Sequence, residues 1–370
     1  MDAAFNSSKI KYTVLDEFMG DFISRNRIKT CNLFINIEHM NYLFRSVYYN
    51  NIFQAYGAAS YKQYASNVLN LVAHYKVWFA RHNVNVKCYI YYTNAAGGFT
   101  SAIINRNYRS RYITMQSLDN PDCYFVNRAI MGAFDLLTKI CDYIDDVYII
   151  NSKGEEPSVV PYLIAQEKPA DWNFMLTKDR LELQYVNYDK FTILYPSKTT
   201  GDKLITSANL WDIICEKEKK PMAHSSEYDP KLFLPVMAIA GNDLRSIRKI
   251  RAIGWGSILE MMEEICIKCK DHSTVTMYDE LTKLLQSTKK NVQEKYMYTF
   301  KMNMLMFSMK SRYDVMSDIN KTMILSQIKN IPDRETINEL STNPVFFGNY
   351  PINVDALFMK NAKPVDWSKK

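Results

Sequence analysis

The stretch IAGNDLRSIRKIRAIGWG, residues 239–256, lies between two helical patterns. The apolar run LFLPVMAIAG (232–241) leads into it, and SILEMMEEICIKC (257–269) follows it. Four cations, Arg245, Arg248, Lys249 and Arg251, stand between its glycines at 241 and 254. Because glycines at both ends of a short polar segment favour turns, the stretch predicts a basic hairpin that joins two helices.

Strand and helix patterns alternate upstream of this hairpin. Short β-rich runs predict strands at residues 32–37, 86–92, 146–151, 174–177 and 190–196. Apolar residues at helical spacing predict helices at residues 60–82, 126–144 and 161–167. This alternation predicts an α/β protein with a mainly parallel central sheet that helices cover on both faces.

The pattern divides the chain into four parts. We expect an N-terminal extension (1–28), an α/β domain (29–230), a helical region that contains the hairpin (231–335) and a C-terminal tail (336–370). Residues 276–330 are helical in pattern, and residues 296–310, YMYTFKMNMLMFSMK, are dense in Met and aromatics. Such a stripe is typical of core packing, and a pliable docking face is the alternative.

Composition indicates a globular protein in a reducing compartment. The 370 residues are 47% hydrophobic and 23% charged, and the net charge of +7 permits polyanion binding without requiring it. No run approaches the ~20 apolar residues of a membrane span, and the N-terminus lacks a secretory pattern. Seven scattered cysteines favour the cytoplasm. The abundant Lys, Asn, Tyr and Met are consistent with an AT-rich genome such as that of a virus, which would make this the host cytoplasm.

Five ordered segments resemble one enzyme family. They are IEHMNYLFR (37–45), the helix, strand and basic region through residue 112, EEPSVVPYLIA (155–165), TKDRLELQYV (177–186) and the hairpin. In order and spacing, residues 30–310 resemble the flap-endonuclease and 5′→3′ exonuclease (PIN-like) family, especially its bacteriophage members. The resemblance implies a 5′-nuclease-like fold with a helix–three-turn–helix at the hairpin.

Many of the acidic positions of this family hold other residues here. The first segment has Glu38 at the family's Asp position, followed by Asn41, Phe44 and Arg45, and Asn94 stands where an Asp is frequent. Glu155 keeps the Glu position, whereas Pro157 and Ser158 replace the paired aspartates. Thr177, Asp179 and Gln184 agree with the pattern, but Leu181 replaces an Asp. In the hairpin, Asn242 and Arg245 replace two aspartates, Arg248 replaces a proline, and Lys249 and Ala252 replace glycines, while Gly241, Ile247, Ile253 and Gly254 are in register.

The resemblance implies chemistry based on two divalent cations, for which most ligands are missing. The aligned acids that remain are Glu38, Glu155 and Asp179. Arg245 would repel a cation at the second position by about 4 kcal/mol per unit charge at ~4 Å and an effective dielectric of ~20. We therefore expect no metal or other cofactor and a protein that is not an enzyme. If residual activity survives, Mg²⁺ or Mn²⁺ on these three acids would support it.

Three functions remain open. The leading hypothesis is binding of DNA or RNA without cleavage. It would use Arg106, Arg109 and Arg111, which are interleaved with tyrosines, and the hairpin's Arg245, Arg248, Lys249, Arg251 and the amides near Gly254. A solvated basic face explains the same residues equally well. The alternatives are a protein-interaction scaffold through residues 297–309 and the tail, with Phe346, Phe347, Tyr350 and Trp367, and a residual metal-dependent nuclease. Cys266, Cys269 and His272 have metal-like spacing without a second pair, so we expect an inert role for them.

Overall fold

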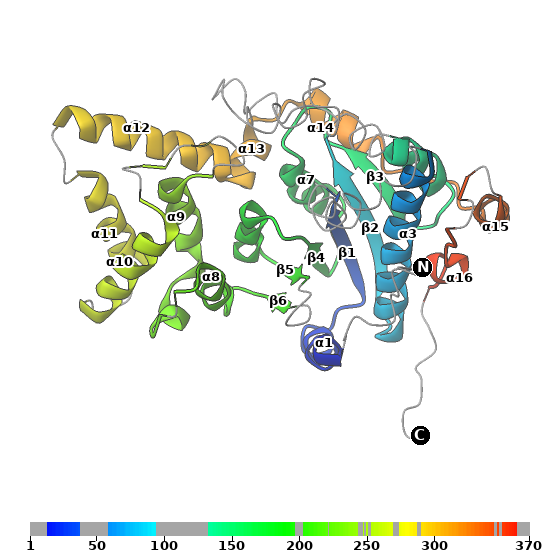
Figure 1. Cartoon of the computed structure of the whole chain (residues 1–370), viewed down its shortest axis with the longest axis horizontal. Helices are drawn as coiled ribbons and strands as arrows, with labels where there is room; N and C mark the ends of the chain where they lie inside the picture. Colours follow the sequence, from blue (N-terminus) through cyan, green and yellow to red (C-terminus); the bar gives the residue numbers. More distant parts are fainter. Residues whose placement is uncertain are drawn as a thin grey trace.

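A six-stranded sheet forms the centre of the molecule (Figure 1). The computed structural model describes residues 13–37, 58–93, 132–196, 203–220, 222–242, 247, 249–250, 253–268, 274–286, 290–343, 346–347 and 350–360. The strands lie in the order β3-β2-β1-β4-β5-β6. Their bounds are β1 Thr30–Asn36, β2 Asn85–Tyr92, β3 Val147–Asn151, β4 Trp172–Leu176, β5 Phe191–Tyr195 and β6 Lys203–Ile205. Strands β1 to β5 pair in parallel and β6 pairs antiparallel with β5, so the predicted α/β class with a mainly parallel sheet is confirmed.

The strands read as continuous apolar runs because both faces of the sheet are buried. In β1, Leu33 and Ile35 enter the core on one face and Phe34 enters the core on the other. In β2, Ile90 and Tyr91 divide in the same way. The alternation assigns each strand residue to one of two cores.

One face of the sheet packs against the N-terminal helices and the C-terminal segment. The elements of this core are α1 (Thr13–Arg25), α3 (Ala58–Arg81), a helix over 132–141, α15 (Arg334–Thr342) and α16 (Val354–Leu357). The helices predicted at 60–82 and 126–144 are confirmed for their described parts, and residues 126–131 lie outside the described residues.

Both ends of the described chain belong to this core, although the sequence analysis set them apart as an extension and a tail. Met19 of α1 is fully buried against the sheet. Phe347 and Leu357 are fully buried as well, and the boundary expected at residue 335 falls inside α15. Polar contacts add to the apolar packing, since Asn70 of α3 donates to the carbonyl of Pro351 (2.9 Å). Short apolar clusters among prolines hid this packing in the sequence.

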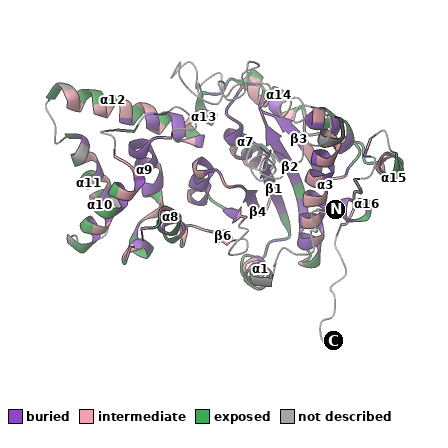
Figure 2. Cartoon of the chain, in the orientation of Figure 1, coloured by how far each residue is buried: buried purple, intermediate pink, exposed green. Residues whose placement is uncertain are grey.

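The opposite face of the sheet packs against the helical region, which occupies the left of Figure 1. Its elements near the sheet are η2 (Pro157–Val159), α7 (Val160–Glu167), η3 (Arg180–Asn187), α8 (Leu210–Glu218), η4 (Ser225–Glu227) and η5 (Pro230–Leu232). Beyond these lie α9 (Phe233–Ala240), α10 (Trp255–Lys268), α11 (Thr274–Gln286) and α12 (Lys290–Phe307), while α13 (Met309–Val315) and α14 (Asp318–Leu325) return to α7. Figure 2 shows that α9 and the strands are almost wholly buried, whereas α10, α11 and α12 each present an exposed face. None of the described helices has the length and apolar run that a membrane crossing needs.

The Met-rich stretch contributes mainly to the core. Phe300, Met306 and Phe307 are buried in the same cluster as α9. On the outer side of α12, Tyr298 is 67% exposed and Leu305 is 45% exposed. The expected core role therefore holds for one face of α12.

The packing of α16 predicts a large effect of truncating its central apolar side chain. Leu357→Ala removes a fully buried side chain that packs toward α3, so we expect a loss of about 3 kcal/mol in the free energy of unfolding. Ile331→Ala is the matched control, because Ile331 is 80% exposed and should change stability by less than about 0.5 kcal/mol. Urea unfolding followed by circular dichroism measures both, and equal small losses would show that the segment is dispensable.

Candidate functional site

The order of the strands reverses at one point of the sheet. From β1 the chain continues to β2 and β3 on one side, and β4 and β5 then lie on the other side. In open α/β sheets, ligands bind outside the carboxyl ends of the strands at such a reversal. Here the reversal lies between β1, which ends at Asn36, and β4, which ends at Leu176. A ligand site is therefore expected among the residues at and after these two strand ends.

A buried carboxyl group, Glu182, occupies this position. Its Oε1 accepts a hydrogen bond from Nδ2 of Asn36 (2.7 Å) and another from the hydroxyl of Tyr91 (2.8 Å). Asn36 and Tyr91 are direct partners in the β1–β2 register, so their side chains leave the same face of the sheet. Burial first, and the carboxyl group of Glu182 second, raise the pKa of Tyr91 far above its ordinary value, so the hydroxyl stays a donor. The three side chains join β1, β2 and the segment after β4.

Asp179 stabilises the local backbone. Its Oδ1 accepts from the backbone N–H of Leu181 (2.9 Å), and it is therefore the N-cap of η3. Its own N–H donates to Oγ1 of Thr177 (2.9 Å). The side chain of Leu181, which stands at a predicted ligand position, is fully buried in the core.

Glu155 lies at the end of a tight turn that follows β3. Ser152 donates to the Glu155 carbonyl (2.6 Å), and Gly154 in this turn has φ +88°, a conformation that favours glycine. The side chain of Glu155 is buried, and its Oε1 accepts from Nδ2 of Asn320 on α14 (2.7 Å). Ser158 lies in the next helical turn, η2, and its buried hydroxyl oxygen has no hydrogen-bond partner.

Glu155 follows β3 and Asp179 follows β4, and each carboxylate accepts a hydrogen bond from its own chain. Among the described residues, no three His, Cys, Asp or Glu side chains gather as a metal ion would require. Glu38 lies outside the described residues.

The hairpin is held by its backbone and by buried isoleucines. Asn242 and Ile247 exchange two backbone hydrogen bonds of 2.9 Å, and the N–H of Ile250 donates to the carbonyl of Ile239 (2.9 Å). Ile247 and Ile250 are both buried in the core of the helical region. Lys249 is exposed. Gly254 has open space around its Cα, so the fold itself would accept a Cβ there. The predicted binding residues Arg106, Arg109, Arg111, Arg245, Arg248 and Arg251 lie outside the described residues.

Arg180 connects the sheet edge with the helix that follows the hairpin. Its guanidinium lies 4.7 Å from the ring centroid of Trp255, the first residue of α10. The same guanidinium forms an ion pair with Glu218 at the end of α8. A planar cation that stacks on a ring and pairs with a carboxylate is well fixed in orientation.

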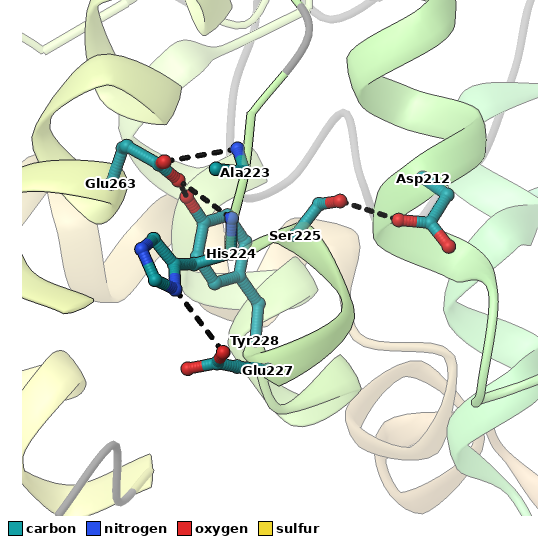
Figure 3. A network of polar contacts seen from close by, with 7 residues as sticks. All are labelled: Asp212, Ala223, His224, Ser225, Glu227, Tyr228 and Glu263. Atoms are coloured by element: carbon teal, nitrogen blue, oxygen red, sulfur yellow. Dashed lines mark hydrogen bonds and ion pairs between the residues drawn. The ribbon is translucent and has the colours of Figure 1, made fainter. Parts of the chain in front are cut away.

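A polar network fixes α8 and α10 relative to each other (Figure 3). Glu263 of α10 accepts from the backbone N–H of Ala223 (2.9 Å) and of His224 (3.3 Å) and from the Tyr228 hydroxyl (2.7 Å). On the other side, Ser225 donates to Asp212 of α8. Burial opposes the charge of Glu263, but these donors outweigh it and lower the pKa of Glu263.

Sequence reasoning missed Asn36, Tyr91 and Glu182 as a group. The available signal was a polar residue at the end of an otherwise apolar strand, NLFINI, and an acid in the apolar-rich segment LELQYV. Neither signal indicates which acid meets which amide, because the contacts span 146 and 91 residues.

This architecture is the 5′-nuclease fold. A complex of the bacteriophage T5 flap endonuclease, described as a pseudo-enzyme–product complex with DNA and metal ions, matches with a TM-score of 0.54 and 13% identity over 80% of this chain and 98% of that chain. The bacteriophage T5 5′-exonuclease with bound zinc matches with the same TM-score and identity over 80% of this chain and 99% of that chain. Likeness at this identity shows the fold alone. No family model matches the sequence, and no curated protein does.

The Glu263 network predicts a pH-dependent stability. Because its pKa in the folded protein lies below the ordinary 4.5, Glu263 stabilises the fold above that pH and loses this contribution as the pH falls through the folded value. Glu263→Gln should therefore cost about 1–2 kcal/mol at pH 7, discounted for partial exposure, and a smaller amount at pH 3.5. Urea unfolding at the two pH values measures the difference, and a cost that is equal at both would contradict the assignment.

The Glu182 group predicts a second effect. Asn36→Asp replaces a donor by an acid beside a buried carboxyl group, so one of the two must hold a proton. We expect a loss of about 2–4 kcal/mol at pH 7 that shrinks toward pH 5, whereas the control Asn36→Ala should lose about 1–2 kcal/mol at both. If Asn36→Asp, measured without metal ions, loses no more free energy of unfolding than Asn36→Ala, the contact of Asn36 with Glu182 is contradicted.

Proposed function

We propose that the protein binds nucleic acid, DNA or RNA, through phosphate contacts and does not cleave it. The observation that carries the proposal is the use of the strand-end acids within the chain itself. Glu155, Asp179 and Glu182 each accept a hydrogen bond from an amide, a hydroxyl or a backbone N–H. Each contact occupies part of a carboxylate that a hard cation would need as an oxygen ligand.

The donor set does not fit a two-metal centre. Two cations about 3.5–4 Å apart require clustered carboxylates. In the described part of the chain the acids are divided between separate contacts, and Pro157 and Leu181 offer no side-chain ligand. We therefore propose that the protein is a non-catalytic member of its fold.

Binding to nucleic acid is supported by the hairpin and the fold. The hairpin follows a rigid, buried helix and presents Lys249 and Gly254 beside Trp255. Exposed cations and accessible backbone amides are the groups that contact phosphates without reading sequence. One solved structure with this fold is a complex with DNA. We propose that the helix–three-turn–helix and the predicted arginines at 106, 109, 111, 245, 248 and 251 extend this surface.

A scaffold function is the second candidate. Its specific support is the exposed pair Tyr298 and Leu305 on the outer side of α12, within the predicted docking stretch 297–309. In the tail, Phe347 is buried in the protein's own core and offers no surface to a partner. Residual nuclease activity with Mg²⁺ or Mn²⁺ on Glu38, Glu155 and Asp179 is the third candidate.

We also propose a reducing compartment, the host cytoplasm for a protein of viral or bacteriophage origin. The described cysteines are free and buried, which suits such a compartment; they are Cys31, Cys88, Cys141, Cys215 and Cys266.

The proposal predicts salt-dependent binding without cutting. Anisotropy of a labelled 5′-flap duplex should show binding that weakens roughly 100-fold between 50 and 200 mM salt, as four phosphate contacts would give. A gel of the same samples in Mg²⁺ or Mn²⁺ should show intact substrate. Cutting that disappears in Asp179→Asn, which keeps the oxygen that caps η3, would overturn the non-cleaving assignment. Absence of binding at both salt concentrations would favour the scaffold.

A further inference from the structure

Two lysines from distant parts of the chain meet at one aromatic ring. Lys178 follows β4, and its Nζ lies 6.0 Å from the ring centroid of Tyr195 at the end of β5. Lys217 lies in the last turn of α8, and its Nζ is 5.6 Å from the same centroid.

The position of Lys178 and Lys217 in the sheet favours a role in ligand binding. It lies at the carboxyl edge of the sheet, beside the reversal between β1 and β4, where ligands of such sheets bind. Lys178 and Arg180 flank Asp179, so cations stand on both sides of a predicted ligand position. Arg180 also connects this edge with Trp255 at the end of the hairpin.

The charges of this edge are only partly compensated. Glu218 pairs with Arg180, and Glu216 pairs with Lys203 (2.6 Å). Lys217 is exposed and forms no ion pair with any described carboxylate. The surrounding protein partly desolvates the ammonium group of Lys217, which lowers its pKa, and the positive charge of Arg180 lowers this pKa further. A bound anion would relieve this repulsion.

We propose that Lys178 and Lys217, supported by Arg180 and by the face of Tyr195, form a phosphate-binding site that holds a nucleic-acid backbone at the carboxyl edge without a divalent cation. Ammonium groups there supply the positive charge that metal ions supply in a cleaving site, but they offer no activated water. The inference rests on the proposed function and deepens it by naming the residues and the charge source. The hairpin and this site would then contact different phosphates of one strand or duplex.

The experiment compares two double variants with equal loss of charge. Lys178→Gln with Lys217→Gln removes the proposed site, and Lys29→Gln with Lys87→Gln removes two exposed lysines at the opposite, amino edge of β1 and β2. Binding of a labelled 5′-flap duplex is measured by anisotropy in EDTA over a range of salt concentrations. Circular dichroism confirms that both variants unfold at the wild-type midpoint.

We expect the wild type and the amino-edge variant to bind in EDTA with affinities within about twofold, since neither edge lysine contacts phosphate. The Lys178 and Lys217 variant should bind roughly tenfold more weakly at 0.1 M salt, and its plot of log K against log salt should be shallower by about 1.8, the value for two lost contacts. Equal effects in both variants, or wild-type binding that needs Mg²⁺, would overturn this inference alone. Wild-type binding in neither EDTA nor Mg²⁺ would overturn the proposed function with it.

Discussion

The hydrogen bonds of Glu182 to Asn36 and Tyr91 set the character of the carboxyl edge. A fully buried carboxyl group is costly unless donors satisfy it, and two adjacent strands supply them here. The register of β1 and β2 presents both donors on one face, so the contact depends on correct pairing of the sheet. At the reversal between β1 and β4, the chain thus makes a buried contact with itself.

The hydrogen bonds of the acidic side chains determine which charges remain available at the carboxyl edge of the sheet. Asp179 is occupied by the cap of η3, and Glu155 is held by Asn320 of α14. Lys178 and Lys217 lie at the Tyr195 ring near the ends of β4 and β5, and their sign favours an anion over a metal ion. In the proposed function, cations at this edge would take the place of metal ligands, so a polyanion would bind without a metal-bound water.

The sequence predicted the parts of the fold that follow from local periodicity. The five parallel strands and helices α3, α7, α9 and α10 were visible because apolar runs and helical spacing are local properties. The short edge strand β6 and helix α8 were missed, since three residues carry little periodicity and the alternating charges of CEKEKK conceal the apolar face of α8. Glu155 and Asp179 were singled out through the resemblance to the 5′-nuclease family, whereas Glu182 and Lys217 were not. Their roles depend on contacts between residues far apart in the sequence, which no local pattern encodes.

The contacts between the sheet edge and the hairpin would fix the distance between the two proposed phosphate sites. Arg180 stacks on Trp255 and pairs with Glu218, while Glu263 and Asp212 fix the segment between α8 and α10. Lys178 and Lys217 are thus carried by a strand end and a helix that these contacts connect to α10. Binding then mainly orders the lysine side chains, which lowers the entropic cost of association. A preorganised pair of sites also fixes which phosphates can be contacted at once, so the shape of the nucleic acid, rather than its base sequence, would determine what binds.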